Sequence, residues 1–291
     1  MSIAQKIHLS EPQFNRLSKV IYDRSGIHFP EAKKYILESR LSHRLGELEM
    51  EDFDQYINYL TMGPYQMDEF QEMFNRITIN ETSFFRNDAQ LGVFERRILP
   101  EIMERRTNKR LRIWSAACSS GEEPFTIAML LHRTLGVRLP DWHIEILGTD
   151  ISEKALNVAH DGLYSQYAMR QTPQLIKDRY FKDEGRNFRL SDEIRTMVSF
   201  ERHNLKDRLA AKRHGTWDII FCRNVLIYFD DPMKEGVLKM FHDQLAEDGT
   251  LFIGHSERIK DLNHGFEALP IPEGFCHQKQ DYIASQQGAA A

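Results

Sequence analysis

Residues 111–130, LRIWSAACSSGEEPFTIAML, indicate the fold class, because a short β-rich run leads through a loop of small residues into a helical pattern. The same alternation recurs further along the chain. Strands are predicted at 111–115, 143–149, 197–201, 217–222 and 250–254, and helices at 122–135, 152–160 and 231–246. Strands that alternate with helices of this length indicate βαβ units and a doubly wound, mostly parallel sheet, so the fold class is α/β.

The chain before this α/β pattern is predicted to be helical. Ser10, followed by an acid and a proline, is a typical helix start, and Gly26 is a typical stop. A second helix, beginning near Glu31, carries one apolar stripe, formed by Leu37, Leu41, Leu45 and Leu48. Shorter helices are predicted at 52–61 and 65–77.

This change of pattern predicts how the chain is divided. Residues 1–79 form a small helical N-terminal domain, residues 80–88 a linker, residues 89–284 the α/β domain, and residues 285–291 a flexible tail. The alternation breaks at about 161–200. We interpret that stretch as an inserted β-subdomain with a small hairpin between the segments FRL and MVSF.

Composition excludes several classes of protein. The 291 residues include 38 basic and 43 acidic side chains, a net charge of −5, which argues against a protein that coats nucleic acid. No apolar run approaches the roughly 18 residues of a spanning helix, so membrane insertion is not expected. Three scattered cysteines are too few for a disulfide framework or a metal site. We therefore expect a cytoplasmic protein, monomeric and without a bound metal.

The loop after the first predicted strand indicates the type of cofactor. A dinucleotide site requires G-x-G-x-x-G at this position, whereas this loop has one glycine, Gly121, followed by Glu122 and Glu123. Two carboxylates would repel a pyrophosphate but suit a cofactor with a sulfonium and an ammonium group. The alternative is that both acids merely complement the helix macrodipole.

Two further strand ends add to this picture. Asp150 ends the second predicted strand, where an acid often binds an adenosine ribose, although it could also serve as a helix cap. The fourth predicted strand leads into CRNVLIYFDDP (222–232), which brings Arg223, Asn224 and Tyr228 to the same edge of the sheet. The alternative for this second segment is a loop that satisfies its own backbone.

Together these segments resemble the CheR family of chemotaxis receptor methyltransferases. The matching motifs, spread in order along most of the chain, are NETSFFR (80–86), WSAACSSGEEPFTIAM (114–129), GTDIS (148–152), NL (204–205), FCRNVLIYFD (221–230) and LFIGHSE (251–257). The resemblance implies a Rossmann-like fold that uses S-adenosyl-L-methionine and yields S-adenosyl-L-homocysteine. It also implies methylation of glutamate side chains in the cytoplasmic domains of chemoreceptors during adaptation.

The resemblance also implies roles for individual residues. Glu123, of the pair Glu122–Glu123, would hold the methionine amino group, and Asp150 the ribose. Arg86 and Tyr228 would lie near the transferred methyl group as catalytic residues. The complete set implied to bind the cofactor is Asn80, Thr82, Arg86, Glu123, Asp150, Asn204, Leu205, Arg223 and Asn224.

Two features bear on the protein partner. Lys33, Arg40 and Arg44 fall on one face of the second predicted helix, and by resemblance this stripe would bind the acidic methylation helices of the receptor. A solvated basic face is the alternative. The short turn KDEGRNFRLSDE (182–193) resembles relatives that do not use a C-terminal pentapeptide tether of the receptor.

Two other functions stay open at the level of sequence. One is a methyltransferase for another protein or a small molecule. The other is a non-catalytic module that binds S-adenosylmethionine or S-adenosylhomocysteine to regulate a partner. A base-labile methyl ester would distinguish glutamate methylation from the first, and turnover with receptor would exclude the second.

Overall fold

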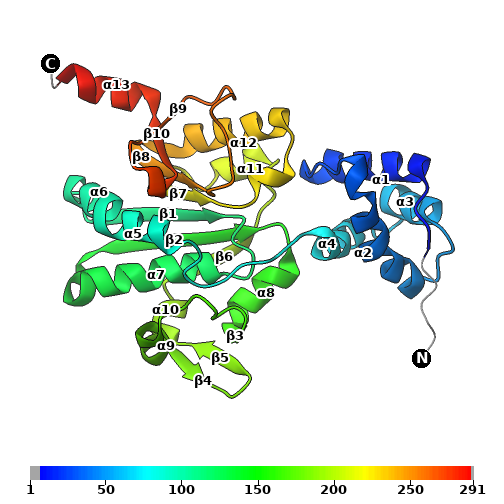
Figure 1. Cartoon of the computed structure of the whole chain (residues 1–291), viewed down its shortest axis with the longest axis horizontal. Helices are drawn as coiled ribbons and strands as arrows, with labels where there is room; N and C mark the ends of the chain where they lie inside the picture. The colour runs from blue at the N-terminus through cyan, green and yellow to red at the C-terminus, as the bar shows by residue number, and fades with distance from the viewer. Residues whose placement is uncertain (1–6, 290–291) are drawn as a thin grey trace.

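The computed structural model describes residues 7–289 as a helical domain joined to a larger α/β domain that carries a small β-sheet (Figure 1). The first six residues of the predicted N-terminal domain and residues 290–291 of the predicted tail lie outside the described residues. Among the described residues, no helix combines the length and the apolar character needed to cross a membrane.

The helical domain forms as its sequence signals predict. Helix α1 (Glu11–Ser25) begins with a capping box between Ser10 and Gln13 and ends at Gly26, whose φ of 76° favours glycine. A 3₁₀ turn, η1 (Glu31–Lys33), leads into α2 (Lys34–Glu47), and α3 (Phe53–Met62) and α4 (Gln66–Ile77) follow. Three leucines of the predicted stripe, Leu37, Leu41 and Leu45, are fully buried in this domain's own core, and Leu48 is half-buried just after α2.

The main sheet has the order β6-β2-β1-β7-β8-β10-β9. Its first five strands are parallel: β6 (Val198–Arg202), β2 (His143–Asp150), β1 (Arg110–Ala116), β7 (Trp217–Cys222) and β8 (Leu245–Ile253). Strand β10 (Cys276–Lys279) then pairs antiparallel with β8, and β9 (Phe266–Ala268) pairs antiparallel with β10. The predicted doubly wound, mostly parallel sheet is therefore confirmed.

Helices cover both faces of this sheet (Figure 1). They are α5 (Asp88–Val93), the π-helical turn η2 (Phe94–Ile98), α6 (Leu99–Arg105), α7 (Glu122–Leu135), η3 (Gly136–Asp141), α8 (Glu153–Asp161), α11 (Arg208–Lys212) and α12 (Asp231–Gln244). Two apolar clusters, one around Phe125 and one around Phe241, form the core on either face. The sequence pattern assigned no element to the run from α5 to α6.

The inserted subdomain differs from its prediction. Its sheet has the order β3-β5-β4, with β3 (Leu163–Ser165), β5 (Asn187–Leu190) and β4 (Phe181–Asp183), and short helices α9 (Gln174–Tyr180) and α10 (Asp192–Arg195) flank it. Strand β6, which contains most of MVSF, pairs with β2 in the main sheet. The predicted hairpin between FRL and MVSF is therefore wrong, because the buried edge of β2 offers MVSF a longer parallel ladder.

The C-terminal end forms a helix that the sequence pattern did not assign. After β10, helix α13 (Gln280–Ala289) includes residues 285–289 of the predicted tail. Alanine and glutamine are good helix formers, so the helix continues without burying much surface. In Figure 1 this helix projects from the α/β domain. The 3₁₀ turns η4 (Leu226–Tyr228) and η5 (Pro272–Gly274) complete the described elements.

Candidate active site

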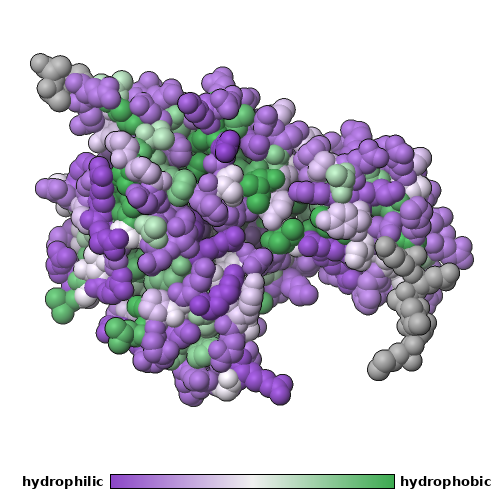
Figure 2. Space-filling model, in the orientation of Figure 1, coloured by the Kyte–Doolittle hydropathy of each residue, from purple (hydrophilic) through white to green (hydrophobic). Residues whose placement is uncertain are grey.

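A cavity lies at the carboxyl ends of β1, β2, β6 and β7, where the linker and the helical domain close over the sheet. Its empty space, counted with the open mouth, is about 1350 Å³. The space-filling view shows the surface deeply notched between the β-subdomain and the helical domain (Figure 2). Ligands of open α/β sheets bind at this edge. The cavity is therefore the candidate site.

At the end of the loop between β1 and α7, the two predicted acids, Glu122 and Glu123, point to different surroundings. Gly121 opens α7 with a φ of 89°, and a Cβ there would come within 2.7 Å of Ala159 Cβ, so the turn requires glycine. Glu123 then lines the cavity. Glu122 points elsewhere, 3% exposed, and accepts a hydrogen bond of 2.7 Å from Ser120 Oγ. Glu123 is thus the acid that can meet a ligand.

Glu123 belongs to a buried ion pair. Its Oε2 lies 3.0 Å from Nη1 of Arg223, and its Oε1 accepts a hydrogen bond of 2.7 Å from Ser115 Oγ. Arg223 also donates from Nη2 to the backbone oxygen of Arg86, at 2.7 Å. Arg223 therefore joins the end of β7 both to α7 and to the linker, and it leaves Glu123 with part of its negative charge compensated.

Asp150 is held by backbone groups on two sides. Oδ2 accepts from Ser119 N at 2.8 Å, and Oδ1 accepts from Ser152 N at 2.9 Å. Burial raises the pKa of Asp150, and the backbone N–H groups of Ser152, Ser119 and Ile151 oppose the rise. A carboxylate has about four acceptor positions, so these contacts do not use all of them and a hydroxyl group of a ligand can still bind.

The linker forms the roof of the cavity, with Asn80, Thr82 and Arg86 among its lining residues. Arg86 donates from Nη1 to the backbone oxygen of Glu81 at 3.0 Å. Tyr228, from η4, is half-buried at the same cavity. Burial raises the pKa of Tyr228, which the positive charges of Arg86 and Arg40 partly oppose, so its hydroxyl is a hydrogen-bond donor at neutral pH.

The helical domain supplies one wall of the cavity. Asn204 donates from Nδ2 to the backbone oxygen of Arg24, at 2.7 Å, and the backbone N–H of His28 donates to the backbone oxygen of Tyr228, at 2.8 Å. The end of α1 is thereby fixed between two loops of the sheet edge. Leu205 and Asn224 line the cavity beside these contacts.

Every residue that the sequence assigned to the cofactor or to catalysis thus lies on one cavity. Lys33 lines it as well. Arg40 and Arg44 are not among the lining residues, and sequence reasoning missed several that are: His28 and Phe29 from the helical domain, and Ser119 and His203 from the sheet edge. The position of Ser119 in the loop after β1 could have identified it as a lining residue. No feature of the sequence marks His28 or Phe29 in the same way.

The residues of the predicted basic stripe, Lys33, Arg40 and Arg44, do not form one open surface. Arg44 pairs with Glu69 (2.6 Å) and Glu47 (2.9 Å), both in the helical domain. Arg40 donates from Nη1 to the backbone oxygens of Ile77 (2.6 Å) and Thr78 (3.1 Å) at the end of α4. Carbonyl oxygens at the end of α4 bind the guanidinium of Arg40, and a buried acid binds that of Arg44. The spacing of charges along one helix cannot reveal such contacts with another helix.

The donor set of the cavity fits an adenosyl cofactor without phosphates. Asp150 offers free acceptor positions, and Nε of Arg223 and Nε2 of His203 are buried without a hydrogen-bond partner among the described residues. Apolar side chains, Leu91, Ile151, Leu205 and Val225, complete the lining. An aromatic base with a polar edge and two ribose hydroxyls would satisfy both kinds of surface.

Comparisons with known proteins identify relatives over nearly the whole chain. The family model described as the CheR methyltransferase SAM-binding domain matches residues 80–275, and the CheR all-alpha domain matches residues 12–78. A chemotaxis protein methyltransferase from Borreliella burgdorferi is 36% identical over 87% of this chain and 90% of its own length. The chain is also 35% identical to chemotaxis protein methyltransferase 2 from Vibrio cholerae, over 90% of each chain. It is 34% identical to the chemotaxis protein methyltransferase from Escherichia coli, over 91% of each chain.

Proposed function

Because the chain belongs to the CheR family of S-adenosylmethionine-dependent methyltransferases, we propose that it methylates glutamate side chains in the cytoplasmic domains of chemoreceptors. The products would be glutamate methyl esters and S-adenosylhomocysteine. Acting on cytoplasmic domains requires a cytoplasmic location. We also propose that it acts as a monomer.

The observation that supports this proposal most directly is that the cavity is lined by residues of the sheet edge, the linker and the helical domain. The sheet edge contributes Asp150, Glu123 and Arg223, while the helical domain and the linker contribute Lys33 and Arg86. A cofactor on the sheet side would therefore face a substrate that approaches between the domains. That arrangement suits transfer to a protruding side chain of a protein partner.

The chemistry needs little from the protein beyond alignment. S-adenosylmethionine supplies an electrophilic methyl group on a positively charged sulfur. A glutamate side chain, with a pKa near 4.3, is already an anionic nucleophile at neutral pH, so no general base is needed. Holding two reactants in line contributes potentially ~7–11 kcal/mol in well-oriented systems. The protein residues therefore need to bind, orient and exclude water.

Arg86 and Tyr228 are the proposed orienting groups. The Arg86 guanidinium is a fixed positive charge that attracts a carboxylate, and the Tyr228 hydroxyl keeps its proton because burial raises its pKa. Both can therefore donate hydrogen bonds to the substrate carboxylate without giving up a proton. We assign the Glu123 carboxylate to bind the cofactor's amino group, and the ion pair with Arg223 holds that carboxylate in place.

We further propose that Lys33, exposed at the cavity, meets acidic residues of the receptor. The β-subdomain offers a tight turn between β4 and β5, closed by a hydrogen bond of 2.8 Å from Glu184 N to Asn187 O. A turn this short favours methylation that does not depend on a C-terminal tether of the receptor.

The test uses methyl-labelled S-adenosylmethionine and purified receptor cytoplasmic fragments. We expect label in the fragment that mild base releases as methanol, because methyl esters are base-labile. A fragment whose methylation-site glutamates are replaced by glutamine is the matched control and should stay unlabelled. Label that resists base would contradict glutamate methylation, and a KM that rises when the receptor's C-terminal extension is removed would contradict tether independence.

A further inference from the structure

The position of the Asp150 carboxylate depends on the backbone that follows it. Oδ1 accepts from the N–H of Ser152, two residues further on, in the local arrangement that aspartate often forms at turns. Ser152 is fully buried and caps α8, its Oγ accepting from Ala155 N at 3.3 Å. Any shift of the turn 150–154 therefore moves the carboxylate.

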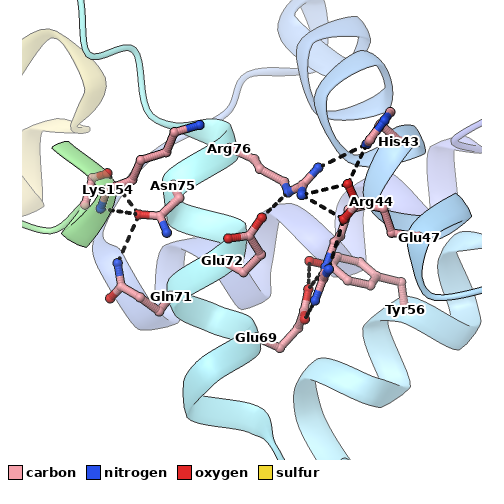
Figure 3. A network of polar contacts seen from close by, with 11 residues as sticks. His43, Arg44, Glu47, Tyr56, Glu69, Gln71, Glu72, Asn75, Arg76 and Lys154 are labelled. Atoms are coloured by element: carbon pink, nitrogen blue, oxygen red, sulfur yellow. Dashed lines mark hydrogen bonds and ion pairs between the residues drawn. The ribbon is translucent and has the colours of Figure 1, made fainter. Parts of the chain in front are cut away.

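Helix α4 of the other domain holds this turn by its polar side chains (Figure 3). Gln71 Nε2 donates to the backbone oxygen of Ile151 at 2.9 Å. Asn75 Oδ1 accepts from Ser152 Oγ at 3.0 Å and from the backbone N–H of Lys154 at 3.2 Å. Lys154 is in the first turn of α8, whose N–H groups lack partners within the helix. Asn75 therefore completes the cap of α8 from outside.

The two α4 side chains are themselves held in place. Gln71 is 9% exposed, and its Oε1 accepts from Arg202 Nη1 at 2.9 Å, which fixes the orientation of its amide. Its Nε2 also contacts Asn75 Oδ1 at 3.3 Å. In Figure 3 Gln71, Asn75 and Lys154 gather on one side of α4, while Arg76 points to residues of its own domain.

We propose that Gln71 and Asn75 are positioning residues for the cofactor site, because they fix the turn that aims Asp150 into the cavity. The proposal rests on the role in cofactor binding assigned to Asp150 above. It makes docking of the helical domain and binding of the cofactor energetically coupled, and such coupling is reciprocal. The helical domain then completes the cofactor site as well as facing the substrate.

The chemistry of Asn75 offers a sharp test. Its Oδ1 accepts both of the hydrogen bonds to the turn described above, from Ser152 Oγ and from the backbone N–H of Lys154. Asn75→Asp keeps such an acceptor at the N-terminus of α8, where a negative charge is favourable, whereas Asn75→Ala removes it. Arg76→Ala is the matched control, because Arg76 bonds to Glu72 and Glu47 within the helical domain.

Binding of S-adenosylhomocysteine to the full chain is measured by titration calorimetry. For Asn75→Ala, and independently for Gln71→Ala, we expect the Kd to rise about tenfold, as it does when the competent conformation falls to about a tenth of the population. Asn75→Asp and Arg76→Ala should stay within about threefold of the wild type. The KM for S-adenosylmethionine should rise with the Kd, while kcat at saturating cofactor stays near the wild-type value.

The outcomes separate this proposal from simple adhesion of the domains. Unchanged Kd values in Asn75→Ala and Gln71→Ala, each folded by circular dichroism, would overturn it. So would an equal rise in Arg76→Ala, or an Asn75→Asp variant that binds as weakly as Asn75→Ala. A wild-type chain that fails to bind S-adenosylhomocysteine would instead overturn the cofactor assignment on which the proposal rests.

Discussion

Glu122 is an acid whose burial should set how stability depends on pH. Its carboxyl lies behind the cavity loop, 3% exposed, with Ser120 Oγ as its side-chain partner. Burial raises its pKa from the ordinary 4.5 to about 7. Replacing it by the neutral, similarly shaped glutamine should remove the cost of burying the charge while keeping an acceptor for Ser120.

The expected size follows from this shift. Below pH 4.5 the carboxyl is protonated in both the folded and the unfolded chain, so Glu122 costs nothing. Between 4.5 and about 7 the unfolded chain loses its proton while the folded chain keeps it, so stability falls as the pH rises. Above this range the accumulated cost is about 3–4 kcal/mol, since the pKa rises from 4.5 to about 7 and each unit of pKa corresponds to ~1.4 kcal/mol.

Urea unfolding of the wild type and of Glu122→Gln at pH 5 and at pH 8.5 measures the effect. We expect the variant to be more stable than the wild type by less than about 1 kcal/mol at pH 5 and by about 3–4 kcal/mol at pH 8.5. Buried histidines such as His277 also change stability with pH, but they contribute equally to both proteins. A difference between the two proteins that does not change with pH would show that the Glu122 carboxyl is not the titrating group.

Three further predictions follow from the ion pairs and the cavity. Arg86→Ala and Tyr228→Phe should each lower kcat at saturating cofactor about tenfold to a hundredfold, measured as labelled methyl transfer, with the Kd for S-adenosylhomocysteine changed less for Tyr228→Phe. Arg223→Met should lower the free energy of unfolding by about 3–5 kcal/mol in urea, because it leaves the Glu123 carboxylate buried without its partner. Arg44→Gln should destabilise the protein by about 3 kcal/mol in the same assay without changing the receptor KM, whereas Arg40→Gln should raise that KM.

The sheet edge could be predicted because its rules are local and topological. A residue at the end of a buried parallel strand must reach the ligand edge, which is why Asp150 and Arg223 could be placed at that edge from their positions alone. The helix starts at Ser10 and Gly121 follow from backbone chemistry that a few residues specify. These signals do not depend on how the two domains pack.

The contacts that sequence could not supply are those between distant segments. Gln71 and Ile151 are 80 positions apart, and nothing in the pattern of α4 marks Gln71 as an interdomain residue. The pairing of MVSF was missed for a similar reason, because a β-rich run can join a neighbouring hairpin or a distant parallel strand. Which partner the run pairs with depends on the burial it gains in the complete sheet, and a short stretch of sequence carries no information about that burial.

The two arginines of the predicted stripe show why a pattern of charges must be weighed against the partners that the fold supplies. Arg44 binds the carboxylates of Glu69 and Glu47, so its positive charge is neutralised where it stands. Arg40 binds neutral carbonyl oxygens, which orient its guanidinium but cancel none of its charge. Arg40 of the helical domain and Arg86 of the linker both oppose the rise in the pKa of Tyr228, so their positive charges are felt at the cavity. In a chain of net charge −5, an acidic substrate would be attracted by this local field and not by the average.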